Sequence, residues 1–106
     1  MLIIPTSAVP NQTLLAQLGG QTAEINVYQE AYGLFVDLYV AGTLIIGGVV
    51  AQNLNRIVRD AYLGFTGDLI FGDTQGTDDP VYWGLGTRWL LAYLGETDLT
   101  AAGFAA

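Results

Sequence analysis

The sequence of 106 residues contains neither cysteine nor histidine. Without cysteine, the chain can form neither a disulfide framework nor a thiolate metal site. Without histidine, it lacks the commonest general base and the commonest transition-metal ligand. Its single serine, Ser7, therefore has no histidine to activate it as a nucleophile. These absences predict a protein that is not an enzyme and that holds no cofactor and no metal.

Positive charge is also scarce, because the chain has no lysine and only three arginines, Arg56, Arg59 and Arg88. Ten acidic residues give a formal net charge of −7. Nucleic-acid binding depends mainly on basic residues that neutralise phosphates, and anionic membrane surfaces attract basic segments. We therefore expect no specific nucleic-acid binding and no membrane partner.

Long hydrophobic runs are missing as well. The strongest apolar run, residues 44–51, is far shorter than the ~20 residues of a membrane-spanning helix. The N-terminus begins apolar, but it has no basic region and is interrupted by Pro5, which is unlike a secretory signal. The sequence predicts a soluble protein without a targeting signal.

Apolar residues make up 52% of the sequence and charged residues only 12%. Because a soluble monomer usually keeps its exposed apolar patches small, so little charge favours a chain whose surface is partly covered by partner subunits. The length suits a single domain. We expect one β domain over residues 1–96 and an alanine-rich C-terminal tail, residues 97–106, that is flexible or bound to a partner.

Alternating apolar and polar residues predict β-strands along most of the chain. Residues 13–18 and 22–29 alternate in this way, and Gly19-Gly20 between them supplies the positive φ angles of a tight hairpin. Residues 33–41 place four apolar side chains on one face, as in a half-buried strand.

The second half of the chain adds further predicted strands. Residues 43–52 are rich in β-branched side chains, and Gly47-Gly48 indicates a bulge within them. Residues 67–73 and 87–95 are two more strands, of which the last is apolar on both faces, as in a strand buried on two sides. The predicted fold is all-β, a single small antiparallel β-barrel or β-sandwich of about six to seven strands, with at most one short helical turn near residues 53–62.

Residues 72–80, GDTQGTDDP, carry Asp73, Asp78 and Asp79 around glycines. An EF-hand calcium loop is disfavoured because its ligand spacing and distal glutamate are missing, although a looser oxygen cage stays open. Catalysis by paired carboxylates is disfavoured because Asp78 and Asp79 are adjacent and diverge on an extended chain. A turn is the stronger interpretation: aspartates bond nearby backbone amides, Pro80 keeps its predecessor extended, and Arg88 pairs with a loop aspartate.

Aromatic residues offer a second candidate site. Tyr82, Trp83 and Trp89 could form a platform for sugars, which would make the chain a stand-alone β-sandwich glycan-binding module. Large aromatic side chains are also typical of cores and subunit interfaces. Arg56 and Arg59 could bind an anion or form a salt-bridged, solvated edge.

The most distinctive stretch is DTQGTDDPVYWGLGTRW at residues 73–89, which comes with IIP and VPNQT near the start and GLFVDLYV at residues 33–40. In this combination the chain resembles the small baseplate plug proteins of contractile-tailed bacteriophages, of the cyanophage type, over about residues 2–95. The characteristic block comprises Asp73, Gln75, Gly76, Asp78, Asp79, Pro80, Tyr82, Gly84, Gly86, Arg88 and Trp89.

The resemblance implies a structural role without enzymatic activity. Family members are small β-rich subunits of the central baseplate, near the hub and spike, where they help close or connect the distal end of the tail tube until infection. The implied location is the tail baseplate of the virion, after synthesis in the host cytoplasm. The implied partners are other baseplate proteins (hub, spike, tube or wedge subunits) and copies of the chain in a ring of three or six. The block residues are candidates for shaping the loop and for assembly contacts.

Overall fold

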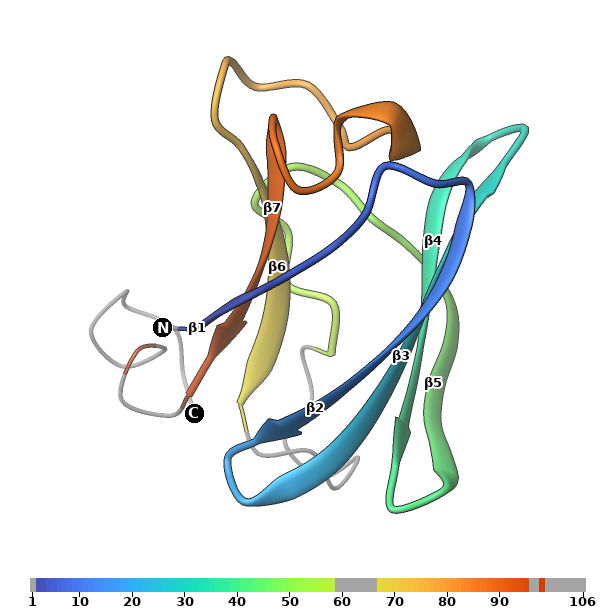
Figure 1. Cartoon of the computed structure of the whole chain (residues 1–106), viewed down its shortest axis with the longest axis vertical. Coiled ribbons are helices and arrows are strands. Elements are labelled where there is room, and N and C mark those ends of the chain that lie inside the picture. The colour runs from blue at the N-terminus through green and yellow to red at the C-terminus, as the bar shows by residue number, and fades with distance from the viewer. Residues whose placement is uncertain (1, 59–66, 96–97, 99–106) are drawn as a thin grey trace.

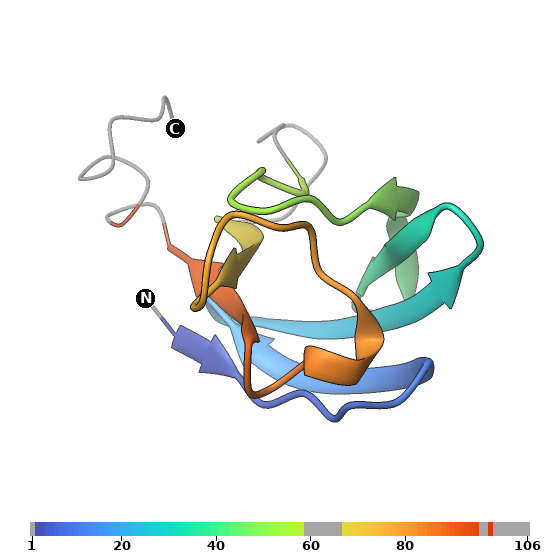
Figure 2. The ribbon, with the colours of Figure 1, turned by 90° about the horizontal axis from the view of Figure 1, so that it is seen from above.

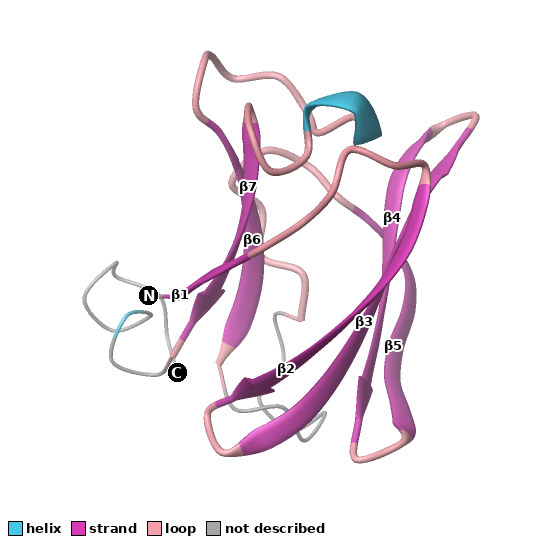
Figure 3. Ribbon diagram, viewed as in Figure 1, coloured by secondary structure: helices cyan, strands magenta, loops and turns pink. Residues whose placement is uncertain are grey.

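The computed structural model describes residues 2–58, 67–95 and 98. Within them the chain is all-β, with seven strands in two antiparallel sheets (Figure 1, Figure 3). The strands are β1 (Leu2–Ile4), β2 (Asn11–Leu18), β3 (Gln21–Glu30), β4 (Gly33–Val40), β5 (Thr43–Val50), β6 (Asp68–Asp73) and β7 (Trp89–Leu94). The predicted fold class is confirmed. No helix in this described part is long and apolar enough to cross a membrane.

Consecutive hairpins build the four-stranded sheet, in the order β2-β3-β4-β5. Gly19 and Gly20 have φ angles of 59° and 78° at the β2–β3 turn, so the predicted tight hairpin is confirmed. Strands β3 and β4 alternate as predicted, with one face buried. The buried side chains on these two strands are Ala23, Ile25, Val27, Leu34, Val36 and Leu38.

The predicted bulge in β5 is present, because the pairing of β4 with β5 shifts register twice between Val36 and Tyr39. Asp37 on β4 supports the irregular stretch, since its Oδ1 accepts a hydrogen bond from the amide of Gly48 at 2.7 Å. The same oxygen accepts a hydrogen bond from the hydroxyl of Tyr28 at 3.0 Å. Burial and this neighbouring carboxylate together raise the pKa of Tyr28.

The three-stranded sheet has the order β1-β7-β6. Strand β7 lies in the middle, and its residues are buried on both faces except for the half-buried Leu90, as its apolar sequence predicts. Strand β1 was not predicted, because three residues are too few for an alternation pattern to be recognised.

The two sheets share one hydrophobic core. Figure 1 shows the three-stranded sheet beside the four-stranded one, and large side chains from both are fully buried between them. Phe71, Leu91 and Trp89 come from the smaller sheet, and Ile25 and Leu38 come from the larger one. Because the two sheets are not joined into one within the described residues, the architecture is a sandwich and not a closed barrel.

The sequence left open one short helical turn near residues 53–62, and the described part of this range, residues 53–58, is not helical. Leu54 has a φ angle of 59°, which is outside the right-handed helical region. Its amide donates a hydrogen bond to the carbonyl oxygen of Phe71 at 2.8 Å. The amide of Ile57 donates one to the carbonyl oxygen of Leu69 at 3.0 Å. Residues 53–58 therefore run along the outer edge of β6 as an irregular strand edge. Residues 59–62, and the predicted tail at 97–106 apart from Asp98, lie outside the described residues.

Candidate functional site

The distinctive block forms the connection between β6 and β7. We call its first half, residues 72–80, the acidic loop; a 3-10 helix (Tyr82–Gly84) and a turn follow and lead into β7. Seen from above in Figure 2, this connection reaches across one end of the sandwich, from the smaller sheet toward the larger one. The contact at its far side is a hydrogen bond from the amide of Tyr82 to the side-chain oxygen of Gln29 on β3, at 3.2 Å.

Arg88 binds two of the loop aspartates. Its Nε and Nη2 donate to Oδ1 and Oδ2 of Asp73 at 2.9 and 2.8 Å, and Nη2 also donates to Oδ2 of Asp78 at 2.8 Å. The sheet register explains the geometry, because Asp73 is paired with Trp89 at the mouth of the connection. The expected pairing of Arg88 with a loop aspartate is therefore present, and the contact with Asp73 is bidentate.

Asp73 also caps the backbone of the acidic loop. Its Oδ1 accepts the amide hydrogen of Gln75 at 2.9 Å and its Oδ2 accepts that of Asp78 at 2.9 Å. The hydrogen bonds from Arg88 hold the pKa of the Asp73 carboxyl well below its usual range, and these two amides add to the effect while burial opposes it. The same contacts raise the pKa of Arg88. The pair is therefore fully ionised across the physiological range.

Trp89 lies beneath the loop and is only 1% exposed. Its indole Nε1 donates to the carbonyl oxygen of Asp78 at 3.0 Å. The guanidinium carbon of Arg88 lies 4.4 Å from the centre of the Trp89 ring. The ring of Trp83 packs edge-on against the Trp89 ring, with the two ring centroids 5.1 Å apart. The loop is thus held by charge, by a buried indole and by aromatic packing at once.

Two glycines of the block are required by close contacts. A Cβ on Gly84 would lie 2.3 Å from Cζ3 of Trp89, so only glycine lets the 3-10 helix pack on the indole. Gly86 has a φ angle of 84°, and a Cβ there would lie 2.5 Å from the carbonyl oxygen of Thr6. Gly76 is different, because its nearest neighbour would be Oδ2 of Asp73 at 3.4 Å.

Asn53 joins the loop to the segment beside β6, a role that the sequence did not indicate. Its amide donates to Oδ1 of Asp79 at 2.9 Å, and its side-chain oxygen accepts the amide hydrogen of Asp73 at 2.8 Å. Pro80 is buried next to Asp79, whereas Gln75 and Gly76 are exposed at the tip of the loop. The structure therefore gathers Asp73, Asp78, Arg88 and Trp89 into one network, with Asp79 held separately by Asn53.

A second ionic cluster, also unforeseen, lies at the other end of β6. Asp68 is fully buried, and its Oδ1 accepts the amide hydrogens of Ile57, Val58 and Leu69 at 3.0, 2.7 and 2.7 Å. Its Oδ2 accepts from Nε of Arg56 at 2.8 Å. Arg56 is thus part of a salt bridge, in line with the salt-bridged alternative, and Arg59 lies outside the described residues. A lone aspartate at the start of a strand gives no sequence signal for such a role.

The metal and glycan alternatives fit this geometry poorly. Asp73 and Asp78 are bound to Arg88 while Asp79 is bound to Asn53, and no group of three metal-ligating side chains converges among the described residues. Of the three aromatic residues in the postulated glycan platform, Trp89 is buried inside the sandwich and Tyr82 is half-buried. Only Trp83, 58% exposed, offers an open ring face.

The comparisons with known proteins give one finding for the whole sandwich. Residues 1–96 match the family model described as "Cyanophage baseplate Pam3 plug gp18". This span includes all seven strands and the entire distinctive block. No match to a curated protein was found.

Proposed function

The chain belongs to the family of cyanophage baseplate plug proteins, since the family model covers residues 1–96 of 106, and we propose that it closes or connects the distal end of the tail tube through protein–protein contacts. Membership makes the chain a structural component of a phage tail baseplate and sets its place in the virion. The family match is the observation that carries the proposal.

Several features of the chain support action by assembly. Charged residues make up only 12% of the sequence, which suits a surface that neighbouring subunits cover. The partners proposed are other baseplate proteins, of the hub, spike, tube or wedge, and copies of this chain arranged in a ring around the tail axis. Ring contacts between copies would be heterologous and would close by rotation. Synthesis in the host cytoplasm precedes incorporation into the virion.

The end of the sandwich that carries the acidic loop is the surface we assign to contact with a baseplate partner. Its loop is held in one shape by Asp73, Arg88 and Trp89, so little conformational entropy would be lost when a partner binds. Trp83 stands exposed on this rigid base, and tryptophan is a frequent anchor of protein interfaces. Asp78, whose side chain is 75% exposed, adds negative charge beside it.

The negative net charge of the chain suits a position at the end of the tail tube, through which DNA leaves. A net charge of −7 repels the phosphate backbone, so DNA passing the plug would not be retained by it. On this proposal the plug acts by being present and then displaced, without chemistry.

Cryo-electron microscopy of intact tails tests the proposal. We expect density for this sandwich at the distal end of the tail tube, with the acidic-loop end against a neighbouring subunit. Tails assembled without the chain should be open or unstable at that end. Density for the chain elsewhere in the virion, or normal closed tails in its absence, would overturn the proposal.

A further inference from the structure

The edge strand β2 has none of the features that usually keep a sheet edge from pairing with another chain. Natural edges are protected by charged side chains, proline, bulges, shortness or a covering segment. β2 reads NQTLLAQL, without charge or proline, and all eight residues pair with β3 without a register shift. The other edges of the described sheets differ, because β5 is bulged, β1 has three residues, and β6 is covered by the amides of Leu54 and Ile57. β2 is therefore the long unprotected edge.

Alternate residues of β2 point their backbone groups away from β3. The β2–β3 turn has two residues, so Leu18 and Gln21 on either side of it bond each other, and bonded pairs then alternate along the ladder. The amide of Gln29 bonds the carbonyl oxygen of Pro10 at 2.7 Å, which gives the same alternation at the other end. No described strand pairs with β2 on its outer side. The residues with outward-facing amides and carbonyl oxygens are Asn11, Thr13, Leu15 and Gln17.

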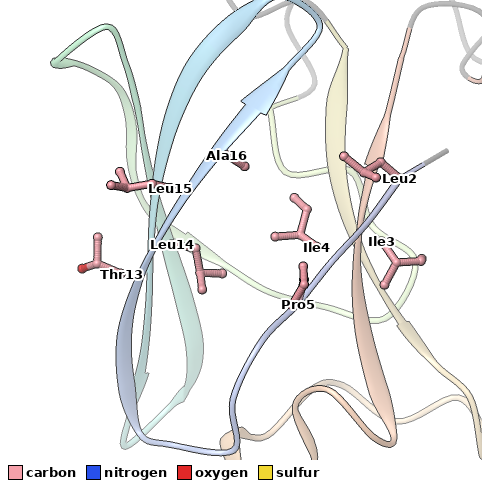
Figure 4. Close-up of a pocket in the computed structure, with 8 residues that line it drawn as sticks. All are labelled: Leu2, Ile3, Ile4, Pro5, Thr13, Leu14, Leu15 and Ala16. Carbon is pink, nitrogen blue, oxygen red and sulfur yellow. The ribbon is translucent and has the colours of Figure 1, made fainter.

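An apolar groove of about 370 Å³ runs beside this edge, between β2 and β1 (Figure 4). Figure 4 shows Leu14 of β2 pointing toward the gap and Ile4 of β1 facing it, while Thr13 and Leu15 lie on the outer side of β2. Leu15 is 73% exposed. The volume of the groove suits single side chains and not a further strand. A strand that pairs along the β2 edge would cover Leu15 and place one of its own side chains at the groove.

Charge indicates which partner fits this edge. No charged side chain precedes Glu24 in the sequence, so β1, β2 and the connection between them form an uncharged flank. The whole chain has a formal net charge of −7, and two copies therefore repel each other when their acidic surfaces approach. At the uncharged flank no like charges come together. This flank suits a second copy of the chain, and the strand that a second copy presents there is its own β2.

We propose that the free chain forms a two-fold dimer in which β2 pairs antiparallel with β2 of a second copy. An axis at Leu14 sets Asn11 opposite the second copy's Gln17 and Thr13 opposite its Leu15, so every outward-facing residue of both strands is paired. An axis at Leu15 would instead set Asn11 opposite Gly19 in the turn. With the axis at Leu14, the Leu14 side chains of the two copies lie opposite each other on the groove side of the joined sheet.

The dimer goes beyond the proposed baseplate role and does not depend on it. A two-fold contact uses the same surface on both copies and closes on itself, whereas ring contacts are heterologous. The pairing thus belongs to the free protein, where it covers an edge that would otherwise be a template for aggregation.

Sedimentation equilibrium of the full-length chain tests the pairing. We expect the mass to rise from one chain to two between about 1 μM and about 1 mM protein. Thr13→Pro removes an outward amide hydrogen and leaves the ladder with β3, because proline is tolerated on the open side of an edge strand. It should weaken the dimer at least about tenfold, since each dimer loses two hydrogen bonds. Thr13→Ala is the matched control: it loses the same hydroxyl and its bond to Asn26 but keeps the amide, and should dimerise like wild type.

Spin labels test the register. The chain has no cysteine, so a single label on each chain reports only distances between copies. Labels at Thr13→Cys should lie close together, because their Cα atoms are diagonal neighbours about 7–8 Å apart. Labels at Asn11→Cys should lie farther apart, with Cα atoms separated by about 20 Å along the strands. Thr43→Cys, an exposed position on β5 three strands from the pairing edge, should give the longest distance.

The combined results decide between the possible contacts. A dimer that is weakened by Thr13→Pro but not by Thr13→Ala, with label distances in the order Thr13, Asn11, Thr43, supports the proposal. A monomer over the whole concentration range, a dimer unaffected by Thr13→Pro, or a trimer or larger ring overturns it. If Thr13→Pro unfolds the chain, the label distances alone decide. A monomer would leave the baseplate role standing, and absence of the chain from the baseplate would leave the dimer standing.

Discussion

The guanidinium of Arg88 donates two hydrogen bonds, of 2.9 and 2.8 Å, to the carboxylate of Asp73, at the point where the connection leaves β6 and enters β7. Asp73 is the last residue of β6, and Arg88 directly precedes β7. The pair closes the base of the acidic loop, and the loop backbone is tied to the same carboxylate through Gln75 and Asp78. This residue pair therefore ties the base of the loop to its tip, and it makes several predictions possible.

Substituting either member of the pair should loosen the loop. Arg88→Lys keeps the charge but loses the planar fork that binds both Asp73 oxygens, so we expect the melting temperature to fall by several degrees. Asp73→Asn should have a similar effect. Asp78→Asn is the matched control, because its side chain is 75% exposed and makes a single contact with Arg88. Thermal unfolding followed by circular dichroism gives the comparison, and equal losses for Asp73→Asn and Asp78→Asn would contradict it.

Acid should destabilise the wild-type protein through Asp73. Its pKa is lowered in the folded state by Arg88, so the folded protein binds this proton more weakly than the unfolded chain does. The stabilisation is present above the unfolded pKa of about 3.9 and is lost as the pH falls below that value. Melting temperatures between pH 7 and pH 2.5 should therefore drop less steeply for Asp73→Asn than for wild type. Parallel curves for the two proteins would rule out this source of acid sensitivity.

Much of the fold could be predicted because its strands are amphipathic. Leu34, Val36 and Leu38 alternate with polar or half-exposed residues, and the structure buries all three. The short helical turn that the sequence left open near residues 53–62 could not be decided from the sequence, for a physical reason. Ile57 and Val58 are buried against β6 while Leu54 is 61% exposed, an arrangement set by pairing with a distant strand and not by a local period.

The candidate site was predictable only in part. Aspartates next to glycine and proline indicate a turn, and an arginine at the start of the next strand suggests a pairing, which the structure contains. The contributions of Asn53 and Asp68 could not be predicted, because they depend on strand register. The loop partners of Asn53 lie 20 or more residues away, and the partners of Asp68 other than its neighbour Leu69 lie 10 or more residues away. The burial of Trp89 likewise follows from its place on the central strand β7.

Gly84 should not tolerate any side chain. Gly84→Ala would place a methyl group 2.3 Å from the Trp89 ring, so either the 3-10 helix or the buried indole must move. We expect a loss of about 1–3 kcal/mol in the free energy of unfolding, measured by denaturant titration. Gly76→Ala is the control, because its added methyl group would meet only ordinary contacts. A Gly84→Ala protein as stable as Gly76→Ala would show that the packing on Trp89 is not tight.

Asp68 should be among the most sensitive polar positions in the chain. Asp68→Ala would leave three buried amides, those of Ile57, Val58 and Leu69, without their acceptor, and would leave Arg56 without this carboxylate. We expect a loss of about 3 kcal/mol or more. Asp68→Asn keeps one acceptor oxygen and should cost less. Hydrogen exchange at the Ile57 and Val58 amides offers a local readout, and unchanged protection in Asp68→Ala would contradict the assignment.

A substitution at Trp83 can test assembly with little effect on the stability of the fold. Trp83 is 58% exposed, and its ring packs edge-on against Trp89, a contact worth about 0.5–1.5 kcal/mol. Trp83→Ala should therefore fold normally with a slightly lower melting temperature. If the acidic-loop end contacts a baseplate partner, the loss of a buried tryptophan anchor weakens that contact by about 2 kcal/mol or more. Tails assembled with the variant should then retain less of the chain, measured by mass spectrometry of purified tails.

Leu44→Ala provides the matched control for Trp83→Ala. Leu44 is 52% exposed near the start of β5, at the opposite end of the sandwich from the 3-10 helix (Figure 1). Retention equal to wild type for Leu44→Ala and reduced for Trp83→Ala would locate the contact at the acidic-loop end. Equal retention of the two variants would remove Trp83 from the interface. A saccharide-dependent change in tryptophan fluorescence that is lost in Trp83→Ala would instead favour glycan binding, because Trp89 is too deeply buried for a sugar to reach.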